Sequence, residues 1–215
     1  MLFIPMNKKI HTVIFDLDGT LCDSAVLTFE AFKRVLPGYA LPLPTLDAIR
    51  RATGFATPEF FYILFPDHDK ELVCKMGIHV EEDEQLLLPS LGSKLLFEGC
   101  QDLLIRLKEY GIRLCIASTG ANDHVFPVLN ATGITGFFDK IFCGQPDKVR
   151  MLQEITGDDD KSGYVMVGDM KKDYEAARAN GIVSVGACYG YCIKEDSHFN
   201  LYIDSALDLL DVLKI

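Results

Sequence analysis

The sequence predicts an α/β fold, a Rossmann-like parallel β-sheet core that carries an inserted all-helical cap domain. Three observations support this prediction. Five short apolar runs have the composition of strands buried on both faces of a sheet. Segments with helical periodicity alternate with the later runs, as in folds whose parallel strands are joined by right-handed crossovers. A long segment after the first run has helical patterns and no run that resembles a strand.

The predicted strands are nearly continuous in apolar and β-branched residues instead of alternating between apolar and polar positions. This continuity is typical of a parallel sheet that helices cover on both faces. The five runs lie at residues 12–15, 114–117, 140–143, 164–167 and 182–185.

Helical patterns fill the segments between the later strands. The apolar residues in them recur at the spacing of one helix face, and a glycine marks the end of two of them. These helices are predicted at residues 101–109, which end before Gly111, at residues 148–155, and at residues 174–179, which end before Gly181.

The segment between the first two strands is predicted to be a helical insertion. Prolines interrupt it early, and the sequence Pro89-Ser90-Leu91-Gly92 is expected to close it. We expect residues 1–22 and 95–215 to form the α/β core domain and residues 23–94 to form the helical cap domain. The helical patterns inside this insertion lie at residues 24–36, 45–51, 58–64 and 67–88.

Composition and charge narrow the class of protein. A chain of 215 residues with 49% hydrophobic residues can bury a substantial core. The net charge of −10 argues against partners that are nucleic acids or anionic membranes, which select clustered Lys and Arg. Residues 1–5 are too short for the apolar region of a signal peptide, and no apolar stretch approaches the ~20 residues of a membrane span.

The seven cysteines are scattered, and no two of them form a CxxC pair. Their spacing suggests neither a disulfide framework nor a zinc site, and several stand within apolar runs as small core residues. We therefore expect a cytoplasmic protein, present as a monomer or a homodimer.

Polar side chains follow the predicted strands, at the edge of a parallel sheet where ligands gather. Asp16 and Asp18 follow the first strand, and Ser118-Thr119 follow the second. The loop after the third strand leads to Lys148. The segment Gly168-Asp169-Met170-Lys171-Lys172-Asp173 follows the fourth.

Asp16 and Asp18 are the first candidates for chemistry. Residues two apart in a strand project to the same side, so the two carboxylates would face one space if the strand continued. Two anions there repel unless a cation lies between them or one holds a proton, and either arrangement serves catalysis. The alternative is that Asp18-Gly19-Thr20 is an ordinary turn that ends the strand.

These segments, in this order, resemble the four motifs of the haloacid dehalogenase (HAD) superfamily. Residues 97–107 and 176–182 add to the likeness, which extends over essentially the whole chain and is closest to the phosphoglycolate phosphatase-like branch with a helical cap. The residues that carry the resemblance are Asp16-Leu17-Asp18-Gly19-Thr20-Leu21, Ser118, Lys148 and Gly168-Asp169-Met170-Lys171-Lys172-Asp173.

The resemblance implies a Mg²⁺-dependent enzyme. Asp16 would be the nucleophile that forms an aspartyl-phosphate, and Asp18 would be the general acid and then the general base. Mg²⁺ would be held by the Asp16 carboxylate, the Asp18 backbone carbonyl and Asp169, because hard oxygen ligands suit this ion. Asp173 would bind the metal directly or through water, or would orient Lys148.

The resemblance also implies a phosphate-binding group. Ser118 and Lys148 would stabilise charge on the transferring phosphoryl oxygens, and Thr119 stands in their loop where Asn is common in the family. Each has a plainer alternative: Ser118 as the cap of a following helix, Lys148 as a surface lysine, and Asp173 as the cap of a helix over residues 174–179.

The leading functional prediction is a phosphatase acting on a small phosphorylated metabolite: phosphoglycolate, a sugar phosphate or a nucleotide. Asp18 disfavours a dehalogenase, because halide leaves without a proton and an alkoxide does not. In the cap, Arg50 or Arg51 is a candidate contact to a substrate anion, the alternative being an exposed helix face.

Other classes stay open at this stage. A phosphomutase of the β-phosphoglucomutase type uses the same core chemistry, although the cap shows no mutase-like pattern. A phosphonate-cleaving enzyme would need a Schiff-base lysine there, and Lys33, Lys70 and Lys75 are poorly placed for that role. A receiver-type signalling domain would lack the Asp18-Gly19-Thr20 context and the helical insertion. A catalytically silent protein on this fold would not need both acids of the first motif.

Overall fold

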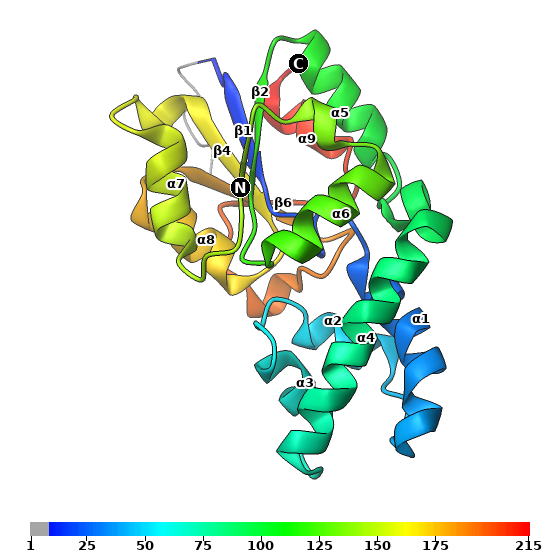
Figure 1. Ribbon diagram of the computed structural model, residues 1–215. Coiled ribbons are helices and arrows are strands. Elements are labelled where there is room, and N and C mark those ends of the chain that lie inside the picture. The colour runs from blue at the N-terminus through cyan, green and yellow to red at the C-terminus, as the bar shows by residue number, and fades with distance from the viewer. Residues whose placement is uncertain (1–8) are drawn as a thin grey trace.

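A computed structural model describes residues 9–215, and its centre is a parallel β-sheet (Figure 1). Within these residues six strands pair in the order β3-β2-β1-β4-β5-β6, and every pairing is parallel. The strands are β1 (Thr12–Phe15), β2 (Arg113–Ala117), β3 (Lys140–Phe142), β4 (Tyr164–Gly168), β5 (Val183–Ala187) and β6 (Leu201–Ile203). The predicted fold class is confirmed, and all five predicted strands are present with ends shifted by at most two residues.

The sixth strand, β6, was not predicted. It has only three residues and pairs with β5 at the edge of the sheet, where Leu201 and Tyr202 are half-buried. A run this short shows no period from which a strand can be distinguished from a loop. Its place in the sheet comes from the pairing with β5.

Helices cover both faces of the sheet, and each face has its own apolar core. Residues of β1 point alternately to the two sides: Val13 and Phe15 pack in one cluster and Ile14 in the other. The first face is covered by α5 (Cys100–Glu109), α6 (Asn122–Thr132) and α9 (Asp208–Leu213), and the second by α7 (Lys148–Thr156) and α8 (Lys171–Ala179) (Figure 1).

Four helices differ from the predictions by more than one residue, and one of them, α9, was not predicted. Helix α6 was also not predicted, because its first turn is polar and Pro127 stands inside it. Helix α8 begins at Lys171 instead of residue 174. Helix α4 (Lys70–Leu91) begins at Lys70 instead of residue 67 and continues through Pro89 to Leu91 before Gly92 ends it. Short 3₁₀ turns complete the chain at Leu36–Tyr39, Gly92–Leu95, Thr135–Phe137, Lys161–Gly163 and Lys194–Asp196.

The insertion after β1 is helical, as predicted. It contains α1 (Ser24–Val35), α2 (Leu46–Ala52), α3 (Glu59–Leu64) and α4 (Lys70–Leu91), which lie together beyond one end of the sheet (Figure 1). Phe32, Phe61 and Met76 belong to a buried cluster of their own, separate from the two clusters of the sheet. The helical unit therefore has an independent apolar core.

Two connecting segments join this helical unit to the sheet, and they run side by side. Asp23 N donates to Leu95 O at 2.8 Å, and Phe97 N donates to Leu21 O at 3.0 Å. These two connections therefore form a hydrogen-bonded junction between the helical unit and the sheet.

No helix among residues 9–215 combines the length and the apolar character that crossing a lipid bilayer requires. The expectation that residues 1–5 are not part of a signal peptide lies outside the described residues.

Candidate active site

The predicted site residues follow three neighbouring strands at one edge of the sheet. Strands β2, β1 and β4 are adjacent, and Ser118, Asp16 and Asp169 come directly after them. Asp16 N donates to Val167 O at 2.9 Å, so the pairing of β1 with β4 extends one residue beyond Phe15. The sheet register thus brings residues from three parts of the sequence to one place.

Three carboxylates form a buried cluster at this edge. Asp16, Asp169 and Asp173 offer oxygen atoms that all lie within 4.8 Å of one another. Their exposed fractions are 8%, 3% and 0%. Carboxylates held this close and this far from water repel one another strongly unless cations compensate their charge.

Lys148 supplies one of the compensating charges. It is the first residue of α7, is 4% exposed, and its Nζ lies 2.9 Å from Asp16 Oδ2 and 2.6 Å from Asp173 Oδ1. The alternative of a surface lysine is therefore wrong. Although burial lowers the pKa of Lys148, the charges of Asp16 and Asp173 raise it above its ordinary value, so the ammonium stays charged.

Asp169 is only partly satisfied. Its Oδ1 accepts a hydrogen bond from Thr20 Oγ1 at 2.7 Å, whereas its Oδ2 has no hydrogen-bond partner among the described residues, although it is buried. Burial, together with the charges of Asp173 and Asp16, raises the pKa of Asp169 well above its ordinary value. An unpartnered buried carboxylate oxygen is costly, and a cation in contact with it would remove that cost.

Both carboxylate oxygens of Asp173 accept hydrogen bonds. Its Oδ2 accepts from the backbone N–H groups of Asp169 at 3.0 Å and Met170 at 2.8 Å, and its Oδ1 accepts from Lys148. Because α8 begins at Lys171, Asp173 lies in the first turn of the helix and not before it. Two of the predicted alternatives therefore hold together: Asp173 contacts Lys148 and also satisfies the N-terminus of α8.

Gly19 leaves room for this cluster. Its φ of +80° is in the left-handed region that favours glycine, and a Cβ there would lie 2.5 Å from Asp169 Oδ2 and 2.5 Å from the Tyr191 ring. The turn after Asp18 can approach Asp169 this closely only without a side chain.

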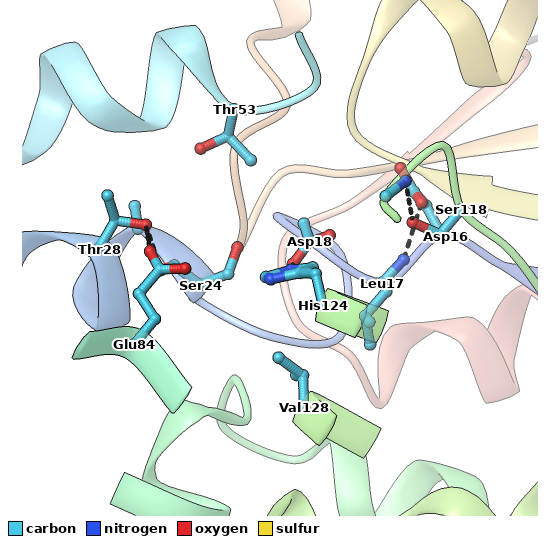
Figure 2. A network of polar contacts seen from close by, with 12 residues as sticks. Asp16, Leu17, Asp18, Ser24, Thr28, Thr53, Glu84, Ser118, His124 and Val128 are labelled. Carbon is cyan, nitrogen blue, oxygen red and sulfur yellow. Dashed lines mark hydrogen bonds and ion pairs between the residues drawn. The ribbon is translucent and has the colours of Figure 1, made fainter. Parts of the chain in front are cut away.

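Asp18 has a different set of partners from Asp16. It lies in the loop after β1, and its Oδ1 is 2.9 Å from Nε2 of His124 on α6 (Figure 2). Burial alone would raise the pKa of Asp18, but the charge of His124 and this hydrogen bond hold it below its ordinary value. Burial lowers the pKa of His124, while Asp18 and then Glu84 raise it to about 9.

His124 was missed in the sequence, although it contacts a predicted site residue. It stands in a helix that was not predicted, 106 positions along the chain from Asp18. A helix recognised just after Ser118-Thr119 in the sequence would have pointed to His124, because the first turn of such a helix must lie at the same edge of the sheet.

Ser118 is 2% exposed and lies near Asp16 (Figure 2). Its N–H donates to Phe142 O at 3.0 Å, and its Oγ accepts from Gly120 N at 3.0 Å. The residue that precedes α6 is Ala121, so the alternative of Ser118 as the helix cap is wrong. Thr119 is half-buried in the same loop.

The two arginines of the helical unit are placed differently. Arg50 forms an ion pair with Asp23, Nη2 to Oδ2 at 2.6 Å, and its guanidinium lies 5.8 Å from the ring centre of Tyr191. Arg51 is exposed. Tyr191 donates from its hydroxyl to Asp23 Oδ1 at 2.6 Å, so Arg50 belongs to the junction between the helical unit and the sheet.

The acid cluster fits a hard divalent cation. Asp16 and Asp169 carry carboxylate oxygens within 4.8 Å of each other, and Asp169 Oδ2 is a buried oxygen without a hydrogen-bond partner among residues 9–215. Burial raises the pKa of Asp16 to about 7, with Asp173 acting in the same direction and Lys148 opposing it. The single charge of Lys148 therefore does not balance the negative charges of the three carboxylates. Carboxylate oxygens are ligands that suit Mg²⁺.

Comparison with known proteins places the chain in a family. The model of the haloacid dehalogenase-like hydrolases matches residues 13–187. Among curated proteins, the chain is 28% identical over 193 residues to the pyrophosphatase PpaX of Bacillus pumilus, covering 86% of each chain. It is 27% identical over 204 residues to a phosphoglycolate phosphatase of Synechococcus elongatus, covering 84% of this chain and 85% of the relative.

Solved structures share the fold over nearly the full length. A predicted phosphoglycolate phosphatase from Haemophilus somnus superposes with a TM-score of 0.80 at 21% identity, covering 96% and 99% of the two chains. A HAD-hydrolase of Bacillus subtilis bound to magnesium gives 0.75 at 16% identity, covering 97% and 100%. A β-phosphoglucomutase from Clostridium difficile gives 0.73 at 21% identity, covering 95% and 96%.

The family model spans both the loop that carries Asp16 and Asp18 and the strand that leads to Asp169. The resemblance found in the sequence is thereby confirmed: the chain belongs to the haloacid dehalogenase-like hydrolase family.

Proposed function

We propose that this hydrolase is a Mg²⁺-dependent phosphatase that removes a phosphoryl group from a small metabolite through an aspartyl-phosphate on Asp16. The observation that carries the proposal is the buried cluster of Asp16, Asp169 and Asp173. Among residues 9–215, Lys148 is the only cation in contact with this cluster, and Asp169 Oδ2 has no hydrogen-bond partner. The phosphatase names of the curated relatives support the same reaction class.

The Asp16 and Asp169 carboxylates, with the backbone carbonyl of Asp18, would hold the metal ion. When bound, Mg²⁺ supplies positive charge that lets an anionic nucleophile and an anionic phosphate approach each other. Asp173 is already engaged by two backbone N–H groups and by Lys148, so we assign it to holding Lys148 and not to direct ligation.

Asp16 and Asp18 divide the chemistry. An oxygen of Asp16 forms a bond to phosphorus while the bond from phosphorus to the ester oxygen breaks, and that oxygen takes a proton from the Asp18 carboxyl. Asp18 then accepts a proton from the water that attacks the aspartyl-phosphate. Free phosphate leaves, and Asp16 is regenerated.

Lys148, Ser118 and Thr119 are assigned to the phosphoryl oxygens. The Lys148 ammonium and the Ser118 hydroxyl lie next to Asp16 at the strand ends, where they can stabilise the charge that spreads over these oxygens as the bond breaks. Uncatalysed hydrolysis of phosphate monoesters is so slow that enhancements reach about 10²¹-fold. One ammonium, two hydroxyl groups and the proposed metal ion around one phosphoryl group agree with that demand.

Residues 23–94 are assigned as the cap domain, and residues 9–22 with 95–215 as the described core. The paired connections at Asp23 and Leu95 support a cap that tilts over the site as a body. Such a motion would release the ion pair of Arg50 with Asp23 and free Arg50 for a substrate anion. Arg51 is exposed and is the second candidate for this contact.

The test is release of inorganic phosphate from a panel of phosphoglycolate, sugar phosphates, nucleotides and p-nitrophenyl phosphate. The parent should require Mg²⁺, Asp16→Asn should be inactive, and Asp18→Asn should be strongly impaired. Asp158→Asn, in an exposed loop, is the matched control and should match the parent. Equal rates in all four proteins, or no release from any substrate, would rule out the proposal. Isomerised product without free phosphate would indicate a phosphomutase instead.

A further inference from the structure

His124 is a polar side chain that the proposed reaction does not use. It reaches from α6 to the Asp18 carboxylate, with Nε2 at 2.9 Å from Oδ1, and the exposed fractions of the two side chains are 28% and 15%. Asp18 lies in the loop between β1 and α1, and its side chain also has a hydrogen bond with Ser24 at the start of α1. The contact with His124 comes from a different part of the sequence.

His124 is itself held in place. The backbone of α6 carries it in the first turn of the helix, and Gln85 on α4 donates from Nε2 to Asp123 O at 2.9 Å beside it. Glu84, also on α4 and 9% exposed, accepts a hydrogen bond from Thr28 at 2.6 Å. Figure 2 shows the Glu84 carboxylate pointing toward the pair of His124 and Asp18.

In this contact the imidazole is the donor, because the Asp18 carboxylate oxygen 2.9 Å from Nε2 can only accept a hydrogen bond. Oδ1 of Asp18 accepts from Nε2–H of His124 whether Asp18 is ionised or carries a proton on Oδ2, so the contact persists when Oδ2 holds the proton for the leaving oxygen.

We propose that His124 is a positioning residue for Asp18: its Nε2–H fixes the Asp18 carboxyl group in the orientation from which it delivers a proton to the leaving oxygen. This inference rests on the proposed phosphatase function. A general acid must lie within hydrogen-bond reach of the oxygen it protonates, and a displacement of about 1 Å can cost on the order of 100-fold in rate.

The proposal predicts a dependence on the leaving group. An alkoxide leaves only if a proton reaches it as the bond to phosphorus breaks, whereas p-nitrophenolate leaves well without one. A misplaced Asp18 therefore slows hydrolysis of alkyl phosphates and spares p-nitrophenyl phosphate. The relevant constant is kcat/KM, because it ends at departure of the leaving group and excludes the later attack of water on Asp16.

The experiment compares the parent with His124→Phe and His124→Gln, using p-nitrophenyl phosphate and glycerol phosphate with Mg²⁺. We expect His124→Phe to lose about tenfold or more of kcat/KM on glycerol phosphate and several times less on p-nitrophenyl phosphate. His124→Gln, whose amide nitrogen stands near the position of Nε2, should recover most of the loss. His79→Phe, at an exposed position on α4, is the matched control and should resemble the parent.

A second variant and a double mutant complete the test. His124→Asn, whose amide is too short to reach Asp18, should reproduce the selective loss if His124→Phe does not fold. Asp18→Asn should show the same preference for the good leaving group, and adding His124→Phe to it should cost little more, because both changes remove one function.

Equal losses on both substrates, or no loss on glycerol phosphate, would overturn the positioning role and leave the phosphatase proposal intact. Failure of the parent to hydrolyse either substrate or any member of the metabolite panel would instead reject the phosphatase proposal, and the inference about His124 with it.

Discussion

Lys148 Nζ lies between two buried carboxylates, 2.6 Å from Asp173 Oδ1 and 2.9 Å from Asp16 Oδ2. Asp16 follows strand β1, Asp173 lies in the first turn of α8 and Lys148 begins α7, so this single ammonium joins three elements. Its removal should therefore affect both stability and chemistry.

Lys148→Met tests that relationship. Methionine preserves most of the volume but leaves Asp16 and Asp173 without their cation, and breaking a buried ion pair typically costs about 3–5 kcal/mol. We expect a lower melting temperature and a loss of roughly 100-fold or more in kcat, measured by calorimetry and phosphate release. Arg150→Met, an exposed position on the same helix, should change neither. A fully active Lys148→Met variant would contradict the assignment.

Metal binding can be followed without any substrate. Mg²⁺ that binds only the folded protein raises its melting temperature as the concentration increases. The parent should be stabilised, and Asp169→Asn should not, because its Oδ2 is the buried oxygen without a partner. Asp173→Asn should still respond to Mg²⁺, since Asp173 is already engaged by Lys148 and two N–H groups. The reverse ranking of the two variants would assign Asp173 as the ligand.

Glu84 predicts a pH dependence of stability. Burial raises its pKa from 4.5 to about 7, with the His124 charge opposing the shift. Between these values the folded state keeps a proton that the unfolded state has released, so this group's contribution to the free energy of unfolding falls as the pH rises from 4.5 to about 7.

Glu84→Gln removes that dependence while its amide oxygen can still accept from Thr28. The variant should be more stable than the parent at pH 8 by about 1–3 kcal/mol, and the difference should shrink below pH 5. Urea unfolding at several pH values measures it. Glu82→Gln, at an exposed position on α4, should track the parent at every pH. A Glu84→Gln variant less stable than the parent at pH 8 would show that the charged carboxylate is favourable here.

Gly19→Ala tests the close packing of the turn after Asp18 against Asp169. The new Cβ would meet Asp169 Oδ2 and Tyr191 at 2.5 Å, in addition to the strain of a positive φ. We expect a loss of stability of roughly 1–3 kcal/mol and loss of most activity, because Asp169 must move. Gly111→Ala has a similar φ, +73°, with nothing within 4 Å of its Cβ, and so isolates the cost of backbone strain. Equal behaviour of the two variants would refute the role of the close contact.

The sequence alone determined the parts of the protein that local pattern encodes. A continuous apolar run specifies a buried parallel strand, and the residues directly after it must then stand at the sheet edge. For this reason the sequence by itself predicts that Asp16, Ser118 and Asp169 lie at the same edge of the sheet. The helical insertion was recognised in the same way, because its periodicity extends over many residues.

Tertiary structure alone decided the partners of these residues. Nothing in the local sequence distinguishes Lys148 as a surface group from Lys148 as a buried ammonium, since the difference depends on how α7 packs against the sheet. His124 and Asp18 lie 106 residues apart and meet only because α6 begins at the edge where β1 ends. Contacts between distant segments depend on the packing of whole elements, and the period of a short sequence run carries no information about them.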